Sequence, residues 1–525
     1  MKRRNFIKTS ALASVFTLIH PVLNANNEHF ATGIDADEAK TSPDASGMRV
    51  GFAELDITPE IGMEVPGGYW KSYNKNFHDP CKVRAMVVDD GKKRIAIVGI
   101  DTLLIPRQLV ETVRKQVESK CGIPGDAILI SASHSHSSGP LVWIFPGEFD
   151  HENELVKTLA YDKSPGIDMK YYSMVEKQLV DVILQADKSR TDASMGVGKG
   201  IEDKVAFNRR FRMKNGMTYT HPGQLNPDIV DVAGPIDPEV GVIGAWNKDG
   251  KCIGCVVNYT CHATCDPGGS SANWIYYMEQ TIRGAMGPDC VVVFLPGASG
   301  DVTQMDNLNP FVNREGEEST RFVGARIGAE AVKVLLDMPK GSMLPLDVQV
   351  SQLKFNKRKP DPDRVKKCYE LVQQSPESVG YTDWVFAKEI VLLDAIIRKE
   401  PVVTAEVQAI QVGPAVFVSN PAEFFCQLGL DIKAGSPFSY TFIVELANGI
   451  IGYVPTEAAF ANDGGGYETR LTAYSNLDIK AGTMIVDESL RMVKQMKPGK
   501  LPEWPKVPPF NGEPWDLGDV KPELH

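Results

Sequence analysis

The chain has 525 residues, of which 43% are hydrophobic and 23% are charged, and this is an ordinary composition for a globular protein. The formal net charge of −11 argues against a nucleic-acid partner, which would require a basic face. A core of this size does not depend on disulfides for its stability, and an odd number of cysteines, nine, leaves at least one thiol without an intramolecular partner.

Residues 1–25 are predicted to be an export signal. The first eight residues carry four basic side chains, and residues 11–19 form an apolar stretch that is too short to span a bilayer. The pair Arg3-Arg4 resembles a bacterial twin-arginine signal, and a Sec signal with paired arginines is the alternative. We therefore expect a periplasmic or secreted protein that uses the twin-arginine export machinery. No later apolar run is long enough for a transmembrane segment.

A polar linker at residues 26–47 is expected to precede one large catalytic domain at 48–496, which a proline-rich tail at 497–525 follows. The strand–helix–strand order within 94–130 predicts a parallel βαβ unit. The fold class is therefore α/β, a mixed sheet core with outer helices. Apolar periodicity predicts strands near 48–56, 83–88, 94–101, 128–130, 193–211, 240–246, 251–262, 290–295, 402–419 and 440–446, and helices near 106–119, 168–189, 319–337, 361–374, 381–398, 422–433 and 484–496.

The stretch AILISASHSHSSGP, residues 127–140, places two histidines at the end of a predicted strand. Proteins of the α/β class usually place their chemistry where strands end in loops. His134 and His136 point the same way if the chain is still extended there. The pattern is typical of one metal ligand beside one proton-transfer histidine, and the alternative is a pair of loop histidines that bond to the backbone.

Other predicted strands also end in polar clusters, which contain His262, Asp301 and Glu423. Two histidines and one glutamate, with a water in the fourth position, form a known catalytic zinc arrangement. His134, His262 and Glu423 are candidates for such a set. They lie far apart in the sequence, so no local spacing distinguishes the set from unrelated polar residues.

Several motifs resemble, in the same order, those of the catalytic domain of the neutral/alkaline non-lysosomal ceramidase family. AILISASHSHSSGP is similar to the family's H-T-H-S-G-P motif, NYTCHAT to N-x-x-x-H, and GDVTQ to G-D-V-S-P-N. NPAEF is similar to G-E-F, NGIIGYVPT to N-x-Y-x-x-Y, VAFNRRF to N-R-S-P, and VGFAELDITP to the opening strand. The resemblance runs from about Arg49 to Leu490. It implies a short form without the family's C-terminal immunoglobulin-like domain.

The resemblance implies one Zn²⁺ ion per chain, with His134, His262, Glu423 and Tyr453 as its ligands. Tyrosine is not a usual zinc ligand, so Tyr453 without the resemblance would be interpreted as an ordinary aromatic residue of a sheet. Gly452 beside it would allow a close approach of the backbone.

The resemblance also implies zinc-dependent hydrolysis of an amide, the reaction of an N-acylsphingosine amidohydrolase, with roles for five further residues. His136 would carry a proton to the leaving amine, and the Tyr467 hydroxyl would stabilise the oxyanion. Asp301 would orient a histidine or the attacking water. Arg209 would bind a polar or anionic substrate group, and the alternative is a solvated arginine at a strand end. Thr303 stands in the place of the family's signature serine.

The positions at which the chain departs from the family's motifs bear on which substrate we expect. Thr303 keeps a hydroxyl group but adds a methyl group, which we expect to crowd a bound headgroup. Gln304-Met305 and Arg210-Phe211 replace the family's Pro-Asn and Ser-Pro pairs. We therefore expect a small-molecule or lipid-like substrate that is more polar or smaller than long-chain ceramide. A non-ceramide amide, an ester or a glycan is the alternative.

Three other classes of protein compete with a zinc hydrolase. Cys252, Cys255, Cys261 and Cys265 are spaced like the ligands of a redox or structural metal site. An odd spacing within an apolar strand would put Cys252 and Cys255 on opposite faces, which favours thiols of the core. The segment GASG lacks the G-x-S-x-G frame of a serine hydrolase, and an intact ligand set argues against a catalytically inactive binding module.

Overall fold

The computed structural model describes residues 47–310, 316–518 and 520–525. The predicted export signal and almost all of the predicted linker lie outside the described residues. The described residues belong to one compact unit, as the prediction of a single catalytic domain requires. Within them, no helix is both long and apolar enough to cross a membrane.

An eight-stranded mixed sheet forms the centre of the fold, with the strand order β12-β11-β10-β5-β1-β2-β3-β4. The pairs β3/β4 and β11/β12 are parallel and the other pairs are antiparallel, so the predicted βαβ unit is confirmed. The strands of the eight-stranded sheet are β1 (Arg49–Asp56), β2 (Lys82–Asp89), β3 (Arg94–Ile100), β4 (Ile128–Ala132), β5 (Thr191–Ile201), β10 (Glu239–Asn247), β11 (Cys252–Tyr259) and β12 (Val291–Pro296).

The two ends of this strand order meet in space. β12 packs against β2, β3 and β4, so the sheet is strongly curled. The chain that leaves β4 therefore runs beside the chain that leaves β11. Ser135 and Ala263 form a parallel bridge, and the His136 amide donates to the Ala263 carbonyl at 3.1 Å. The curl brings two segments with candidate histidines together.

A second sheet has the order β14-β15-β16-β18, in which β16 and β18 are parallel. Three small sheets, β17/β19, β13/β6 and β8-β7-β9, carry connecting segments. The strands are β14 (Leu346–Asn356), β15 (Val402–Val412), β16 (Ala415–Ser419), β18 (Tyr440–Val444), β17 (Glu423–Phe424), β19 (Tyr453–Val454), β13 (Val302–Thr303), β6 (Phe207–Asn208), β7 (Arg210–Met213), β8 (Thr218–Thr220) and β9 (Ile229–Val232).

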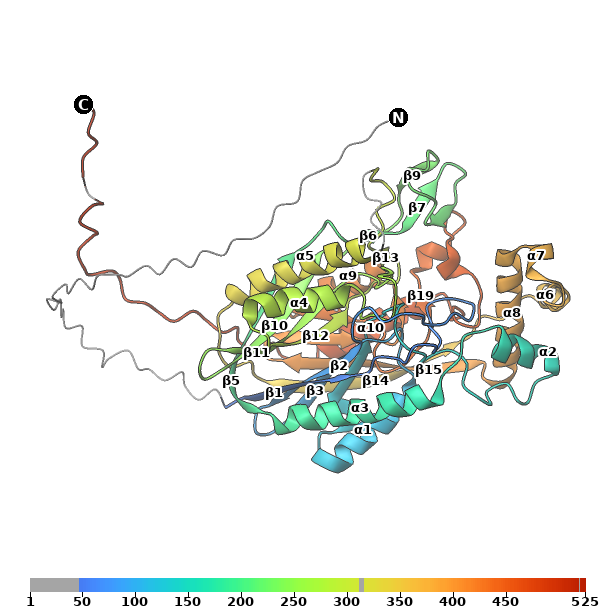
Figure 1. Cartoon of the computed structure of the whole chain (residues 1–525), viewed down its shortest axis with the longest axis horizontal. Helices are drawn as coiled ribbons and strands as arrows, with labels where there is room; N and C mark the ends of the chain where they lie inside the picture. Colours follow the sequence, from blue (N-terminus) through green and yellow to red (C-terminus); the bar gives the residue numbers. More distant parts are fainter. Residues whose placement is uncertain (1–46, 311–315, 519) are drawn as a thin grey trace, which may run out of the picture. The chain divides into compact units, whose positions relative to one another are not determined.

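Helices cover the sheets (Figure 1). α3 packs on α1, β1 and β2, while α4 packs on α5, which covers β5 and β10. α9 and α10 pack beside the second sheet, and α6, α7 and α8 are inserted between β14 and β15. The helices are α1 (Arg107–Cys121), α2 (Glu154–Lys157), α3 (Met169–Lys188), α4 (Trp274–Met286), α5 (Gly316–Leu336), α6 (Pro362–Leu371), α7 (Pro376–Val379), α8 (Tyr381–Lys399), α9 (Cys426–Gly435) and α10 (Ala481–Val493).

Two predicted elements are wrong in a way that matters for the site. The run 193–211 is broken into β5, β6 and β7, and Arg209 lies between the last two. The helix predicted at 422–433 begins only at Cys426. Glu423 instead belongs to strand β17, because its amide donates to the Gly452 carbonyl and it pairs with Tyr453. Tertiary pairing thus overrides the local helical pattern.

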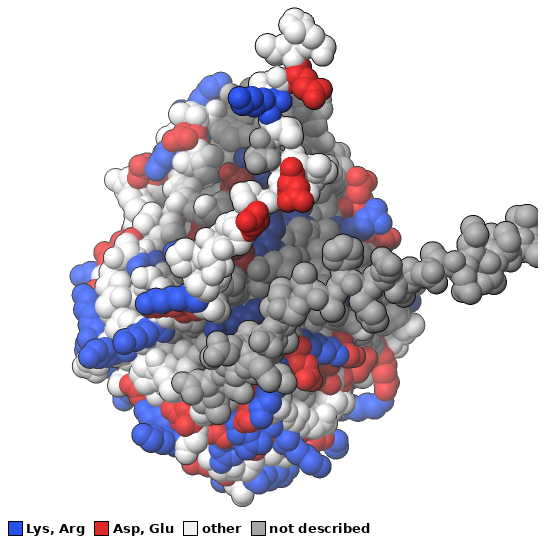
Figure 2. All heavy atoms as spheres, turned by 90° about the vertical axis from the view of Figure 1, so that its left-hand side faces the viewer, with Lys and Arg blue, Asp and Glu red and all other residues white. Residues whose placement is uncertain are grey.

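The charged surface is mixed in sign. Figure 2 shows Lys and Arg side chains interspersed with Asp and Glu side chains on one face of the molecule. Many exposed charges form local pairs, such as Lys248 with Asp192 at 2.8 Å and Lys251 with Asp289 at 2.6 Å. Such exposed pairs contribute little to stability.

Candidate metal centre

His134 lies just beyond β4, in a backbone conformation that is unusual for a residue other than glycine. Its φ is +63°, in the left-handed region, so the chain is not extended there as the i, i+2 argument assumed. Hydrogen bonds on both sides hold the residue in place: the Ser133 amide donates to Ile100 O at 2.8 Å and the Ser135 amide to Thr102 O at 3.2 Å. Strained backbone of this kind is concentrated at functional sites.

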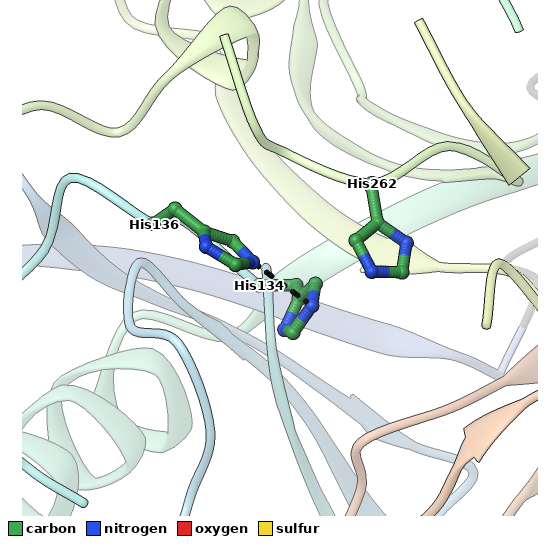
Figure 3. A group of neighbouring side chains, drawn as sticks. All are labelled: His134, His136 and His262. Carbon is green, nitrogen blue, oxygen red and sulfur yellow. Dashed lines mark hydrogen bonds between the residues drawn. The ribbon is translucent and has the colours of Figure 1, made fainter. Parts of the chain in front are cut away.

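The three imidazoles of His134, His136 and His262 converge (Figure 3). Each Nδ1 faces a backbone carbonyl, at 2.9 Å for His134 with Leu103 O, 3.1 Å for His136 with Gly67 O, and 2.7 Å for His262 with Ser299 O. A carbonyl only accepts, so each Nδ1 carries the proton and each Nε2 presents a lone pair. The predicted bonds to the backbone are therefore present, and they orient the rings toward one another.

The Glu423 carboxylate lies close to two of these Nε2 atoms. Its Oε2 lies 3.1 Å from His262 Nε2 and 3.3 Å from His134 Nε2. Burial lowers the pKa of His262 to about 3. Burial alone would raise the pKa of Glu423, but the neighbouring His134 and His262 hold it well below its ordinary value. A neutral His262 imidazole beside an ionised Glu423 carboxylate has the protonation states that a divalent metal ion requires.

The donor set fits a metal ion. Ligand atoms that lie 2.0–2.1 Å from a tetrahedral zinc ion are about 3.3 Å from one another. Glu423 Oε2 has this relation to both His134 and His262, and His136 Nε2 lies 3.3 Å from His134 Nε2. Acceptor atoms this close repel one another unless a cation or a proton lies between them. Among the described residues, His134, His136 and His262 form the one group of three or more His, Cys, Asp or Glu side chains that could hold a metal ion.

Tyr453 lies beside Glu423, on β19. It pairs with Glu423 of β17 in a parallel register, so both side chains lie on one face. Its hydroxyl lies 2.8 Å from the Tyr467 hydroxyl and accepts from Arg209 Nη2 at 3.2 Å. A Cβ atom at Gly452, where φ is +79°, would clash with the Tyr474 carbonyl, so the predicted close approach of the backbone is confirmed.

Arg209 is buried and lies among protein partners. Its Nε donates to Glu468 Oε1 at 3.0 Å and its Nη2 to Gly300 O at 2.7 Å. It does not line the cavity described below. The arginine is therefore not solvated, and its contacts hold Tyr453 and the loop at Gly300 in place. Its predicted contact with substrate stays a prediction.

Asp301 and Thr303 also lie outside that cavity. Asp301 accepts from Asn208 Nδ2 and from the Cys426 amide, both at 2.8 Å, and so ties β6 to the start of α9. The Nδ1 of His262 is oriented by a carbonyl, not by this carboxylate. Thr303 Oγ1 accepts from the Met305 amide at 3.2 Å, and the crowding of a headgroup by its methyl group stays a prediction.

A cavity of about 430 Å³ opens onto His134, His136, Glu423, Tyr453 and Tyr467. Much of its wall is apolar and comes from the inserted helix α8 and from the loop after β4. These wall residues are Trp143, Ile144, Phe386, Leu392 and Ile396.

Lys388 links α8 to two other segments that line the cavity. Its buried Nζ donates to Tyr69 O and Ser164 Oγ, both at 2.8 Å, and pairs with Glu389 at 3.1 Å. Tyr69 and Ser164 belong to two other loops that line the cavity. A buried ammonium with three partners is satisfied, so Lys388 is a structural tether of this wall.

Sequence reasoning missed Tyr474, which lines the cavity and donates from its hydroxyl to Glu423 Oε1 at 2.6 Å. Its ring also packs edge-on against Trp143 at 4.8 Å. This bond leaves Glu423 Oε2 facing the histidines. No motif marks the residue, because the contact is made across the fold.

We expect Tyr474→Phe to lower the affinity for Zn²⁺ by roughly 10-fold, because outer partners of a ligand usually contribute 10–100-fold. The ring contact with Trp143 is retained, so the fold should not change. Competition with a chelator measures the affinity. Tyr381→Phe, which removes an exposed hydroxyl bonded to Glu377, is the matched control. Equal zinc affinity in both variants would remove this role of Tyr474.

The four cysteines of the competing interpretation do not form a metal site. Cys252, Cys255, Cys261 and Cys265 are buried in one apolar cluster, as thiols of the core, and the group named above contains none of them. Cys252 and Cys255 share this cluster despite their odd spacing, and the register of β10 and β11 shifts beside Cys252. All nine cysteines are unpaired.

Comparison with known proteins identifies the fold. No protein-family model and no curated protein matches the chain. The neutral ceramidase from Pseudomonas aeruginosa matches with a TM-score of 0.61 and 18% identity, over 87% of this chain and 76% of that chain. A structure of ceramidase complexed with C2 matches with a TM-score of 0.62 and 18% identity, over 87% of this chain and 77% of that chain. The chain therefore has the neutral ceramidase fold, as the resemblance of its sequence motifs predicts.

Proposed function

We propose that the chain is a zinc-dependent hydrolase of the neutral ceramidase type, which cleaves the amide bond of an N-acyl substrate. One observation carries the proposal. The donor atoms of His134, His136 and His262 are grouped, Glu423 Oε2 contacts two of them, and His134, His136 and Glu423 line a largely apolar cavity. The ceramidase fold supports this interpretation, and the named residues supply the chemistry.

His134, His262 and Glu423 would hold the ion, with Tyr453 as the fourth protein candidate. When bound, Zn²⁺ supplies Lewis-acid activation of water and of the substrate carbonyl. The pairing of Tyr453 with Glu423 and the hydrogen bond from Arg209 would hold Tyr453 in position for this role.

His136 is the proton carrier in this proposal. Its Nδ1 proton is held by Gly67 O, so its Nε2 is free to take a proton from the attacking water and to deliver it to the leaving nitrogen. Tyr467 is the oxyanion donor. Burial raises the pKa of Tyr467, so its hydroxyl stays protonated and can donate to the carbonyl oxygen as negative charge develops there.

The apolar wall of the cavity suits an acyl or alkyl part of the substrate, which would lie between Trp143 and α8. Purified, zinc-loaded protein should release free amine from N-acyl substrates. The panel that tests this compares short-chain and long-chain N-acyl lipids, simple amides, esters and glycosides. We expect amides with shorter or more polar groups to react faster than long-chain ceramide. Cleavage of esters or glycosides without release of amine from any amide would contradict the proposal.

We also propose that the protein is exported by the twin-arginine route to the periplasm or the medium. The pair Arg3-Arg4 and the short apolar stretch after it support this. Changing both arginines to lysine should leave the precursor in the cytoplasm, which fractionation and immunoblotting would detect. Normal export of that variant would favour the Sec route, and retention of the unchanged protein in the cytoplasm would exclude export altogether.

A further inference from the structure

Glu445 is a fully buried carboxyl group that none of the proposed chemical steps uses. It follows β18 directly and has 0% exposure. Its Oε1 accepts from the Ser299 hydroxyl and its Oε2 accepts from the Phe424 amide at 2.8 Å. Its carbonyl also accepts from the Ser131 hydroxyl at 2.9 Å. Burial of a carboxyl group without such hydrogen-bond partners would lower the free energy of unfolding.

Three hydrogen-bond partners of Glu445 lie near candidate metal ligands. The Ser299 carbonyl accepts from Nδ1 of His262 at 2.7 Å. Phe424 is the residue after Glu423, and Ser131 belongs to β4, the strand that leads to His134. One residue is therefore bonded to all three segments that bring His134, His262 and Glu423 together.

These segments belong to different parts of the fold. His134 follows β4 and His262 follows β11 of the large sheet, Glu423 lies in the small β17/β19 sheet, and Glu445 follows β18 of the second sheet. Displacements of these units relative to one another would change the distances between ligands. We propose that Glu445 is a positioning residue that fixes the separation of His262 and Glu423 by bonding Ser299 and Phe424 at once. This inference rests on the proposed metal site.

The hydrogen bonds of the Glu445 side chain also determine which substitutions of this residue should be tolerated. Burial raises the pKa of Glu445 well above its ordinary value, which favours the neutral carboxyl group. Glutamine has nearly the same shape, with an oxygen to accept from the Phe424 amide and an NH₂ group to donate to Ser299. Leucine would leave both of these buried groups without partners. Ser299→Ala removes the hydroxyl and keeps the carbonyl that orients His262.

The test measures the dissociation constant for Zn²⁺ by competition with a chelator, together with the melting temperature of the zinc-free protein. We expect Glu445→Gln to bind zinc like the unchanged protein. Ser299→Ala should bind about 10-fold more weakly, and Glu445→Leu up to about 100-fold more weakly. Thr320→Val is the control, because it removes a buried hydroxyl bonded to Gly316 O on α5 and should change only the melting temperature.

The outcomes separate this inference from the proposed function. If the unchanged protein takes up no zinc, the metal site itself is wrong, and the positioning role falls with it. If the unchanged protein binds zinc and Ser299→Ala binds it equally tightly, only the role of Glu445 is overturned. Ser299→Ala decides the matter if Glu445→Leu does not fold. A loss of affinity in Thr320→Val as large as that in Ser299→Ala would also overturn the inference, because general destabilisation would then explain both.

Discussion

Replacing His262 or Glu423 with alanine is expected to abolish zinc binding and hydrolysis together. Glu423 Oε2 lies within 3.3 Å of both His134 Nε2 and His262 Nε2, so each substitution removes a donor from the centre of the set. The loss of zinc affinity should exceed the roughly 10–100-fold that removal of an outer partner causes. Elemental analysis after dialysis measures zinc per chain, which should fall from about one to near zero.

His151→Ala is the matched control, because this histidine is exposed and its ion pair in the described part of the chain is with Glu152, at 3.6 Å. It should retain both zinc and activity. Stoichiometric zinc in His262→Ala and Glu423→Ala, with circular dichroism like that of the unchanged protein, would show that the ion is held elsewhere.

Replacing His136 with alanine is expected to separate metal binding from catalysis. Its Nε2 lies 3.3 Å from His134 Nε2, and in the described part of the chain no hydrogen bond or ion pair joins it to Glu423, so we expect zinc to remain bound. Removal of a general acid–base group usually costs about 10²–10⁴-fold in rate. The value of kcat on the best amide should therefore fall by this factor, while KM and zinc content change little.

The roles of the two neighbouring histidines can be reversed by experiment. If His136→Ala loses zinc and His134→Ala retains it, then His136 is the ligand and His134 the proton carrier. If both variants lose zinc, all three histidines hold the ion, and the proton must be carried by another group.

The sequence predicts those parts of the molecule that repeat a local pattern. The strands 83–88 and 94–101 are apolar runs with a turn between them, and the structure has β2 and β3 at these places. The order β3-α1-β4 also follows from the pattern, since a strand, a helix and a strand in succession form a parallel pair. Polar residues at the ends of strands point to His134 and His262, because sheets present strand ends at one edge.

The remainder of the site depends on contacts between distant segments. Glu423 is predicted on a helix because residues 422–433 have a helical pattern, yet pairing with Tyr453 places it on a strand. Tyr474 and Glu445 act through bonds to residues more than 20 positions away in the chain, which no periodicity reveals. The inserted α8 is predicted as a helix, but its role as a wall of the cavity follows only from packing.

Anomalous diffraction at the zinc absorption edge, from crystals of zinc-loaded protein, tests the metal centre most directly. We predict one strong peak in the cavity, with His134 Nε2, His262 Nε2 and Glu423 Oε2 as the nearest protein atoms at about 2.0–2.2 Å. No peak between these three side chains, or a peak at the buried cysteines instead, would contradict the proposed centre.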